Sequence, residues 1–375
     1  MDSKRTLTPN EYRYFLALAL APKIGPSVFK AILAYSGSAK GFFEIPKGKV
    51  SKTPGVRPKL LSLRNEKDTL LKKADKVLDQ AEKGAFTITT YLDEAFPQRL
   101  KLQEDGPVLL FSKGKSNLNF PRTIGIVGTR SATSYGKEAT KKMIQDLSPY
   151  GATIISGLAY GIDIQAHRSA MENGLPTIAV LGSPINKIYP SIHEKVAEEL
   201  QLNGALISEY PPGSTMVPGN FPARNRIIAG MSDALIVVEA AKKGGALITA
   251  EIAYSYDKPV FAVPGNLQSK YSEGCNHLIQ KMKASIYTGP RDIAQALFWE
   301  EPGKKQRIKP SLDFSNRDPE EQKILKFLQE NKEMDIDQLS YQTEIGLGVL
   351  ASILLTLEFE GIVKSLPGKK YKLLV

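Results

Sequence analysis

Hydrophobic and polar positions follow three different patterns along the chain. In residues 1–80, apolar positions recur at helical spacing, as in "KIGPSVFKAIL" and "TPGVRPKLLSL". From about residue 86 to residue 300, short runs that are apolar throughout alternate with amphipathic stretches. The last 60 or so residues return to helical spacing and end in two short strand-like runs. The pattern therefore predicts three structural units.

The middle unit has the pattern of a doubly wound α/β fold. The runs predicted to be strands are "RTIGIVG", "TIISG", "TIAVLGS", "ALISEY", "DALIVVEA", "PVFAVPG" and "SIYTG". Wholly apolar strands joined by helical crossovers are typical of a parallel sheet that is covered on both faces. We therefore expect a Rossmann-like, mostly parallel sheet whose ligands bind beyond the carboxyl ends of the strands.

The flanking segments predict smaller domains of other kinds. Residues 1–84 are expected to form a helical domain of the SAM or helix-hairpin-helix type, and residues 85–300 the Rossmann-like domain. Residues 301–317 are rich in charge and proline and are predicted to be a linker. Residues 318–375 show three helical runs followed by a two-stranded wing, the order of a winged helix.

Composition excludes some classes of protein. Of 375 residues, 42% are hydrophobic and 24% are charged, as in soluble globular proteins. No apolar run approaches the ~18 residues of a membrane span, and the apolar N-terminal stretch has no small-residue cleavage site. Cys275, the single cysteine, cannot form an intrachain disulfide. These features predict a cytoplasmic protein with no membrane partner.

The net charge of +11 is unevenly distributed along the chain. Residues 1–120 carry +9, residues 121–300 carry +2 and residues 301–375 carry 0. A basic excess favours polyanionic partners, although a solvated surface explains it equally simply.

The run "IGIVGTRSATSYGKEAT", residues 124–140, has the form of a phosphate-binding turn between a strand and a helix. A dinucleotide fingerprint needs a third glycine after Gly125 and Gly128, and this run has none at the right offset. A P-loop is excluded because Ser131 and Glu138 occupy positions that need Gly and Ser or Thr. What remains is a glycine, two hydroxyls and a guanidinium suited to phosphate: Gly128, Thr129, Arg130 and Ser131.

The ends of other predicted strands repeat this composition. The candidate residues there are Ser156, Gly157, Arg224, Asn225, Arg226, Lys243, Gly244 and Gly245. Two arginines at the start of a helix oppose the helix dipole, and an anionic ligand would remove that conflict. Asp163 and His167 are four residues apart but have no third metal ligand beside them, so we predict no metal site and assign Asp163 to helix capping. Without a nucleophile–base pair, the set favours phosphate binding over catalysis.

Five of these motifs together resemble the DNA-processing protein A family of bacteria (DprA/Smf). The motifs are "GIVGTRSATSYG", "IISGLAYGIDIQAH", "FPARNRIIAGMSDALIVVEA", "GGALITAEIA" and "KPVFAVPG". The resemblance implies a protein that binds single-stranded DNA, protects incoming strands during natural transformation and helps to load the recombinase RecA. It also implies a homodimer formed through the Rossmann-like domain, with no cofactor and no catalytic turnover.

Carried over by position, the resemblance places the strand-binding pocket at Gly128, Arg130, Ser131, Arg224, Asn225 and Arg226, with Lys243, Gly244 and Gly245 in a corresponding loop. Tyr160 departs from the family pattern, which often has arginine in "SGLARGID". Its ring is suited to stacking on a base, and a packed surface tyrosine is the equal alternative. The helix "GCNHLIQKM" is a candidate dimer surface if it exposes Leu278, Ile279 and Met282; the alternative is that this face is buried.

Two further interpretations concern the enzyme class and the winged helix. "GGALITAE" keeps Gly244, Gly245 and Glu251 of the motif in the related "lonely guy" phosphoribohydrolases, but it lacks their third glycine and Thr249 is shifted by one. Glu251 alternatively pairs locally. The run from residue 333 to 363 contains no Lys or Arg and several acidic residues. Because a helix that enters the major groove normally carries basic and amide side chains, we predict that this module does not read duplex DNA.

Overall fold

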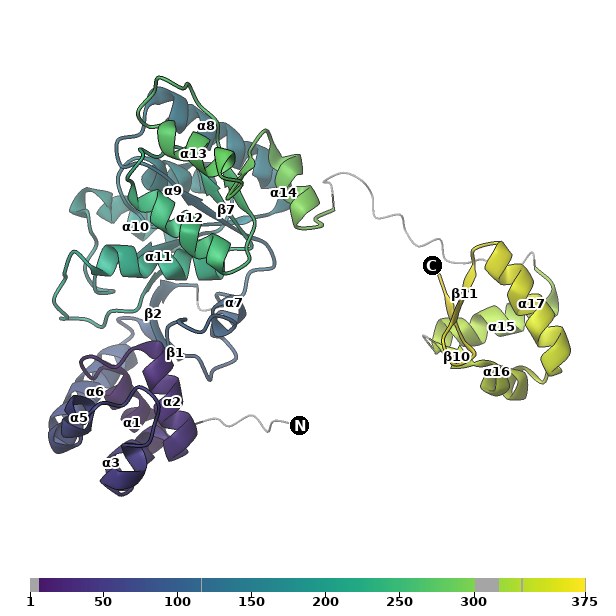
Figure 1. Cartoon of the computed structure of the whole chain (residues 1–375), viewed down its shortest axis with the longest axis horizontal. Helices are drawn as coiled ribbons and strands as arrows, with labels where there is room; N and C mark the ends of the chain where they lie inside the picture. The colour runs from purple at the N-terminus through teal and green to yellow at the C-terminus, as the bar shows by residue number, and fades with distance from the viewer. Residues whose placement is uncertain (1–6, 116, 301–316, 332, 375) are drawn as a thin grey trace. The chain divides into compact units, whose positions relative to one another are not determined.

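A computed structural model describes residues 7–115, 117–300, 317–331 and 333–374 (Figure 1). The chain divides into two compact units, Met1–Glu301 and Pro302–Val375, which are described separately. The predicted linker, residues 301–317, lies almost entirely outside the described residues.

The N-terminal helices form a small domain around aromatic side chains. Their bounds are α1 (Pro9–Ala19), α2 (Pro26–Ser36), α3 (Ala39–Glu44), α4 (Lys47–Val50), α5 (Pro58–Leu61), η1 (Ser62–Glu66) and α6 (Lys67–Glu82). The side chains of Thr8 and Glu11 close a capping box that starts α1. The rings of Phe15 and Phe29 meet edge to face at 4.8 Å between centroids. The same core continues to Phe111 in the neighbouring sheet, which holds these helices against it.

The sheet within the described residues has nine strands in the order β1-β2-β6-β5-β4-β3-β7-β8-β9. Their bounds are β1 (Thr87–Thr90), β2 (Leu109–Gly114), β3 (Thr123–Val127), β4 (Thr153–Ser156), β5 (Thr177–Leu181), β6 (Ala205–Ser208), β7 (Ala234–Val237), β8 (Val260–Ala262) and β9 (Ser285–Ile286). Neighbours from β6 to β9 are parallel, whereas β1 and β2 are antiparallel additions at one edge. The predicted mostly parallel Rossmann-like sheet is confirmed; β1 and β2 were not predicted.

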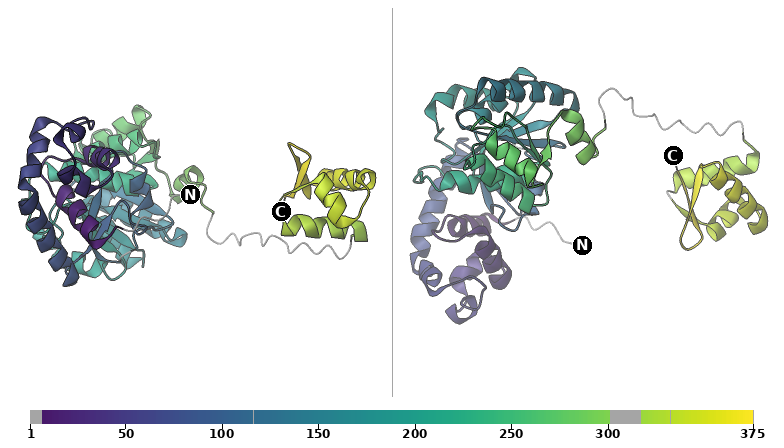
Figure 2. Two further views of the ribbon diagram at one scale, coloured as in Figure 1. Left: turned by 90° about the horizontal axis from the view of Figure 1, so that it is seen from below. Right: turned by 45° about the horizontal axis from the view of Figure 1, so that its top comes forward.

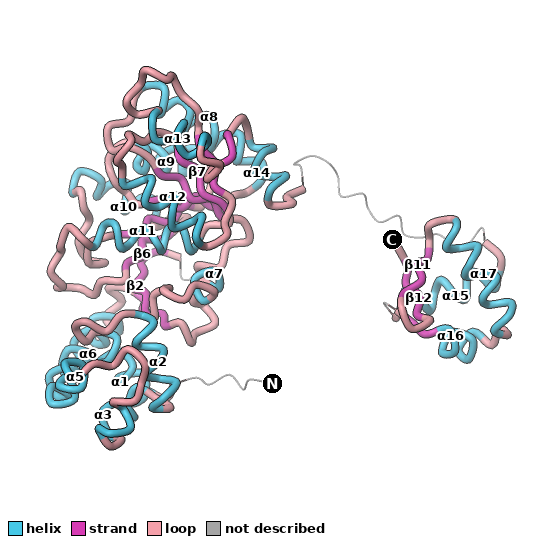
Figure 3. The backbone as a smooth tube through the Cα atoms, in the orientation of Figure 1, coloured by secondary structure: helices cyan, strands magenta, loops and turns pink. Residues whose placement is uncertain are grey.

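Helices cover both faces of this sheet, as Figures 2 and 3 show. One face buries α11 (Asn220–Met231), α12 (Gly245–Ser255) and α13 (Glu273–Gln280). The other buries α8 (Ser134–Leu147), α9 (Ile162–Glu172) and α14 (Pro290–Ala296). The shorter helical pieces are α7 (Gln98–Lys101), η2 (Ser148–Tyr150), η3 (Ser191–His193) and α10 (Glu194–Leu200). Strand-to-helix loops therefore gather at the carboxyl ends of the parallel strands.

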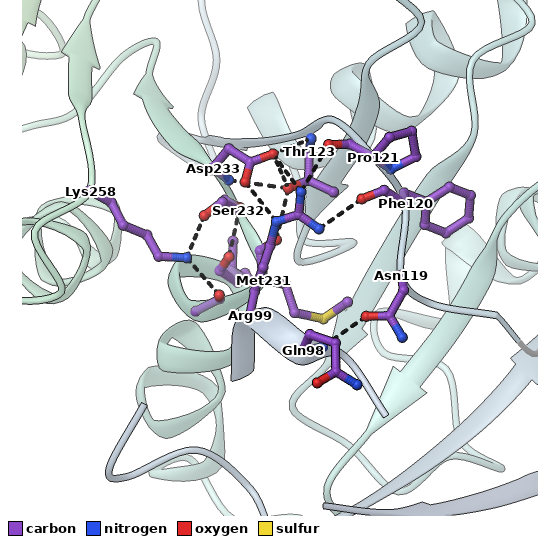
Figure 4. Close-up of polar contacts among 12 residues, drawn as sticks. Gln98, Arg99, Asn119, Phe120, Pro121, Thr123, Met231, Ser232, Asp233 and Lys258 are labelled. Atoms are coloured by element: carbon purple, nitrogen blue, oxygen red, sulfur yellow. Dashed lines mark hydrogen bonds and ion pairs between the residues drawn. The ribbon is translucent and has the colours of Figure 1, made fainter. Parts of the chain in front are cut away.

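A polar network fixes the C-terminal end of α11 (Figure 4). Arg99 on α7 binds both carboxylate oxygens of Asp233, at 2.6 and 2.9 Å, and the same carboxylate accepts a hydrogen bond from Thr123 N–H at 2.8 Å. Lys258 Nζ donates to the carbonyl oxygens of Gly230, at 2.6 Å, and Ser232. Burial lowers the pKa of Lys258 to about 8. Because this end of α11 is anchored to β3 and β7, the other end projects rigidly toward the carboxyl edge of the sheet.

The C-terminal unit is a winged helix, as predicted. It contains α15 (Pro319–Glu330), β10 (Met334–Asp335), α16 (Ile336–Thr343), α17 (Leu347–Phe359), β11 (Val363–Leu366) and β12 (Lys370–Leu373). The strands form an antiparallel sheet in the order β10-β12-β11. Leu325, Leu339 and Leu354 belong to a core that the unit forms by itself. Across the described ranges, no single helix is long and apolar enough to cross a membrane, and α16 with α17 meets that test only as a pair bent by 111°.

Candidate nucleic-acid interface

A cleft of about 400 Å³ opens at the carboxyl ends of β3, β4 and β7. The loop after β3, the start of α11 and the loop before α12 form its walls. Of the predicted residues, it brings together Gly128, Thr129, Arg130, Arg224, Asn225, Lys243, Gly244 and Gly245. Five strand-to-helix connections, those after β3, β4, β6, β7 and β8, thus contribute to one site, although the sequence separates the first from the last by more than one hundred residues.

The turn after β3 is shaped by close packing at Gly128. A Cβ atom there would lie 2.4 Å from Ile162 Cγ1, so only glycine lets the turn approach α9. Thr129 N–H donates to the carbonyl oxygen of Glu239 at 2.7 Å, which ties the turn to the end of β7. The Glu239 carboxylate in turn accepts hydrogen bonds from Thr133 N–H at 2.9 Å and Thr133 Oγ1–H at 2.6 Å. The turn leaves Arg130 exposed at the edge of the cleft.

Arg224 is buried at the floor of the cleft, and its guanidinium is not free to bind a phosphate. The side chain is 4% exposed, and its Nη1 donates to the carbonyl oxygens of Gly157, at 2.8 Å, and Val180. Burial lowers the pKa of Arg224 to about 10, and the nearby Asp163 carboxylate opposes that shift. Burial likewise raises the pKa of Asp163, against the effect of Arg224. Arg224 Nε has no hydrogen-bond partner among the described residues.

Several predicted residues have their polar groups engaged within the protein. Ser156 is buried and donates to the carbonyl oxygen of Ile126 at 2.6 Å. Gly157 N–H donates to Asp163 Oδ2 at 3.1 Å. Arg226 is paired with both oxygens of Glu209 at 2.6 Å, so the arginine that seemed to need an anionic ligand already has an anionic partner. Neither Arg226 nor Ser131, Ser156, Gly157 or Tyr160 lines the cleft. Their role in DNA binding stays a prediction.

The cleft also contains residues that the sequence did not single out. Phe221 and Pro222 lie at the start of α11, within one turn of the predicted Arg224, and Lys270 and Tyr271 come from the loop after β8. Phe221 belongs to the motif "FPARN", and its position in the sequence close to Arg224 could have indicated that it lines the cleft. Lys270 had no such signal, because the contact depends on how the loop "GNLQSKYSEG" folds back over β7.

The predicted exposure of Leu278 is wrong. This side chain is 3% exposed and packs with Cys275 in the core beneath the sheet, because α13 turns that face inward. Ile279 is partly buried, and Met282 is 87% exposed. A dimer surface at Ile279 and Met282 stays a prediction, and Leu278 is a core residue.

Glu251, the residue of the phosphoribohydrolase alternative, lies outside this cleft. Its carboxylate pairs with Lys283 Nζ at 2.7 Å. Over the described part of the chain, no group of three His, Cys, Asp or Glu side chains is placed to hold a metal ion.

His167 lies in the interior behind the cleft. Its Nδ1 is 2.7 Å from Thr177 Oγ1, which itself donates to the carbonyl oxygen of Ile154, so Nδ1–H is the donor. Nε2 has no partner among the residues that the structure describes. Burial, with smaller contributions from Arg224 and His193, lowers the pKa of His167 to about 3.

Acid is therefore expected to destabilise the protein through His167. The unfolded chain takes up a proton near pH 6.5, whereas folded His167 does so only near pH 3. This contribution is present above pH 6.5 and is lost as the pH falls toward 3, by about 2 kcal/mol between pH 7 and pH 5. Urea titrations at both pH values should show a smaller loss in His167→Gln than in wild type or in the exposed neighbour control Arg168→Gln. Equal losses in all three would contradict the assignment.

Comparison with known proteins shows the family. The family model described as DNA recombination-mediator protein A matches residues 87–298, and that of the DprA winged helix domain matches residues 309–369. The DNA processing protein DprA of Streptococcus pneumoniae is 40% identical over 209 residues, which cover 56% of this chain and 73% of the relative. Protein Smf of Synechocystis is 37% identical over 277 residues, covering 66% and 69%.

Two solved structures extend the comparison to the fold. The X-ray structure of DNA processing protein A from S. pneumoniae matches with a TM-score of 0.65 at 34% identity, covering 77% of this chain and 98% of that one. DNA processing protein A from Helicobacter pylori, described with its single-stranded DNA binding mode, matches with a TM-score of 0.51 at 33% identity, covering 57% and 96%. The chain belongs to the DNA recombination-mediator protein A family.

Proposed function

We propose that this protein binds single-stranded DNA in the cleft and acts as a mediator of recombination without catalytic turnover. One observation carries the proposal. Three exposed cations, on Arg130, Lys243 and Lys270, surround a glycine-lined cleft at the carboxyl edge of the sheet. The single-stranded DNA binding described for the H. pylori relative supports the same ligand.

The start of α12 adds a second phosphate-binding element. Gly244 caps this helix without any side-chain hydrogen bond, and open space surrounds the Cα of Gly245. Free backbone N–H groups and the positive end of the helix dipole favour an anion at such a place. We place a DNA phosphate here, between Lys243 and Arg130. The neutral glycines let the sugar–phosphate backbone approach closely.

The preference for single strands comes from the aromatic wall and from the winged helix. Phe221 lines the cleft, and its ring can stack on a base only where the base is unpaired. The winged helix does not offer α17 as a helix for reading duplex DNA, because α17 contains no Lys or Arg. Lys364, Lys369, Lys370 and Lys372 on the wing remain available to phosphate, although Lys370 pairs with Glu333 at 2.9 Å.

We extend the proposal to the roles that the family resemblance implies. These are protection of incoming DNA in natural transformation, loading of RecA and homodimer formation. The extended cleft supports the first role, since a protein without turnover can remain bound along a strand. The proposed contacts to RecA follow from the family resemblance.

The phosphoribohydrolase alternative is less well supported. Glu251 would have to approach a sugar, but its carboxylate is paired with Lys283 and lies outside the cleft, in an adjacent hollow that it shares with Lys243. Incubation with nucleoside monophosphates, followed by chromatography for free base, separates the two functions. Release of base that Glu251→Gln abolishes would establish the enzyme.

Arg130→Ala is expected to weaken single-stranded DNA binding about 10-fold for all sequences, because it removes one charge-assisted phosphate contact. The slope of log K against log salt should fall by ~0.7, the value for one lost contact on a single strand. Fluorescence anisotropy at several salt concentrations measures both. Lys137→Ala is the matched control, since Lys137 is an exposed cation on α8 outside the cleft. Equal effects of the two substitutions would argue against the cleft.

A further inference from the structure

We propose that Tyr189 and Tyr160 continue the cleft as a base-stacking surface, so that the strand leaves the phosphate-binding residues and lays its next bases on these rings. We call Phe221, Tyr189 and Tyr160 the aromatic shelf. The inference rests on the proposed function, since it names where further nucleotides of the same ligand bind.

The shelf begins inside the cleft at Phe221. The ring of Tyr189 lies against it, with 5.3 Å between centroids and 52° between planes, and Tyr189 is 45% exposed. Gly182, at the end of β5, leaves the space that the Phe221 ring occupies, because a Cβ on residue 182 would lie 2.7 Å from Phe221 Cδ1. An apolar surface therefore runs without interruption from the cleft wall to the loop after β5.

Tyr160 reaches the same loop from the opposite side. It follows Ala159, which lines the cleft, and its ring meets the His193 ring edge to face at 5.2 Å. His193 is held in place because its Nδ1–H donates to the carbonyl oxygen of Leu158 at 2.9 Å. Tyr189 and His193 are four residues apart in one loop. One short segment therefore contacts both Phe221 and Tyr160.

The exposure of these rings points to a ligand and not to core packing. Tyr160 is 48% exposed, and the neighbouring Ile192 is 72% exposed. Aromatic rings beside a basic groove are how proteins bind single strands without sequence preference, since every base has a face on which to stack. Lys187, two residues before Tyr189, adds an exposed cation to the same loop. An unrelated protein partner would not require this continuity with the cleft.

The test compares two ligands with the same backbone: an oligothymidylate and an oligomer of the same length in which every position is abasic. Anisotropy titrations use the full-length protein. Wild type should bind the oligothymidylate more tightly. Tyr189→Ala and Tyr160→Ala should each lose about 5-fold or more on the oligothymidylate, as expected for one stacked base. Neither should change affinity for the abasic strand or the salt slope. Tyr189→Trp should keep wild-type affinity.

Tyr35→Ala is the control, since Tyr35 is a 59% exposed tyrosine on α2. The inference is overturned if wild type binds both strands equally, or if the tyrosine variants match Tyr35→Ala on oligothymidylate. It is also overturned if they lose as much on the abasic strand, which would indicate damage to the cleft. If an alanine variant fails to fold, Tyr189→Leu or Tyr160→Leu replaces it; each keeps apolar bulk without a planar ring and should show the same selective loss on the oligothymidylate. Failure of the proposed function looks different: wild type would then bind neither strand, or Arg130→Ala would leave binding unchanged.

Discussion

Replacing Arg130, Lys243 and Lys270 together by alanine is expected to weaken single-stranded DNA binding by about three orders of magnitude, at ~10-fold for each lost phosphate contact. All three side chains are exposed on the cleft, and no hydrogen bond or ion pair joins them to other described residues. Their removal should therefore leave the fold unchanged. The salt slope should fall by about 2, the sum of three contacts at ~0.7 each.

The matched control removes the same charge elsewhere. Lys72, Lys73 and Lys76 are exposed cations on α6, in the basic N-terminal part of the chain. Their triple alanine variant has the same net charge as the cleft variant and should bind with an affinity within a few-fold of wild type. If both variants lose affinity equally, the general basic field of the protein binds DNA, and the cleft has no special role.

Asp163→Ala is expected to lower the free energy of unfolding by about 3 kcal/mol, because it leaves Arg224 buried without a counter-charge. It also removes the acceptor for Gly157 N–H. Since Arg224 and Gly157 shape the floor of the cleft, affinity for single-stranded DNA should fall in the same variant. Urea denaturation measures the first effect, and anisotropy at saturating folded protein measures the second.

A double variant separates charge from packing at this position. Arg224→Met in the Asp163→Ala background removes the buried cation and should recover part of the lost stability. Asp163→Asn keeps an acceptor for Gly157 N–H without the charge, so it should lie between wild type and Asp163→Ala. If Asp163→Ala is as stable as wild type, the carboxylate does not compensate Arg224, and the buried pair has been wrongly described.

The sequence predicted the sheet well because its central strands are buried on both faces. Runs such as "TIAVLGS" are apolar throughout, and few other structures produce them. β1 and β2 were missed because they form an antiparallel edge, where Thr87–Thr90 is buried only in its second half and Leu109–Gly114 becomes exposed at its end. Edge strands carry a weaker pattern, since only part of each is covered.

The types of residue at the site could be predicted from the sequence, but the residues that each of them contacts could not. A cation close to glycine at a strand end indicated Arg130 and Lys243, and both lie on the cleft. Arg226 could not be separated from them, because its partner Glu209 lies at the end of β6 and only the folding of the loop before α11 brings the two together. Leu278 is different, because Cys275, Leu278 and Ile279 share one face of a short helix, and that spacing already favoured the buried alternative.

The most direct test is a titration of the wild-type protein with single-stranded and double-stranded DNA of the same length at two salt concentrations. We predict tighter binding to the single strand, with affinity that falls steeply with salt at ~0.7 per phosphate contact. Duplex binding should be weaker at both concentrations. Equal or tighter binding to duplex, or single-strand affinity that does not change with salt, would contradict the assignment of the cleft to single-stranded DNA.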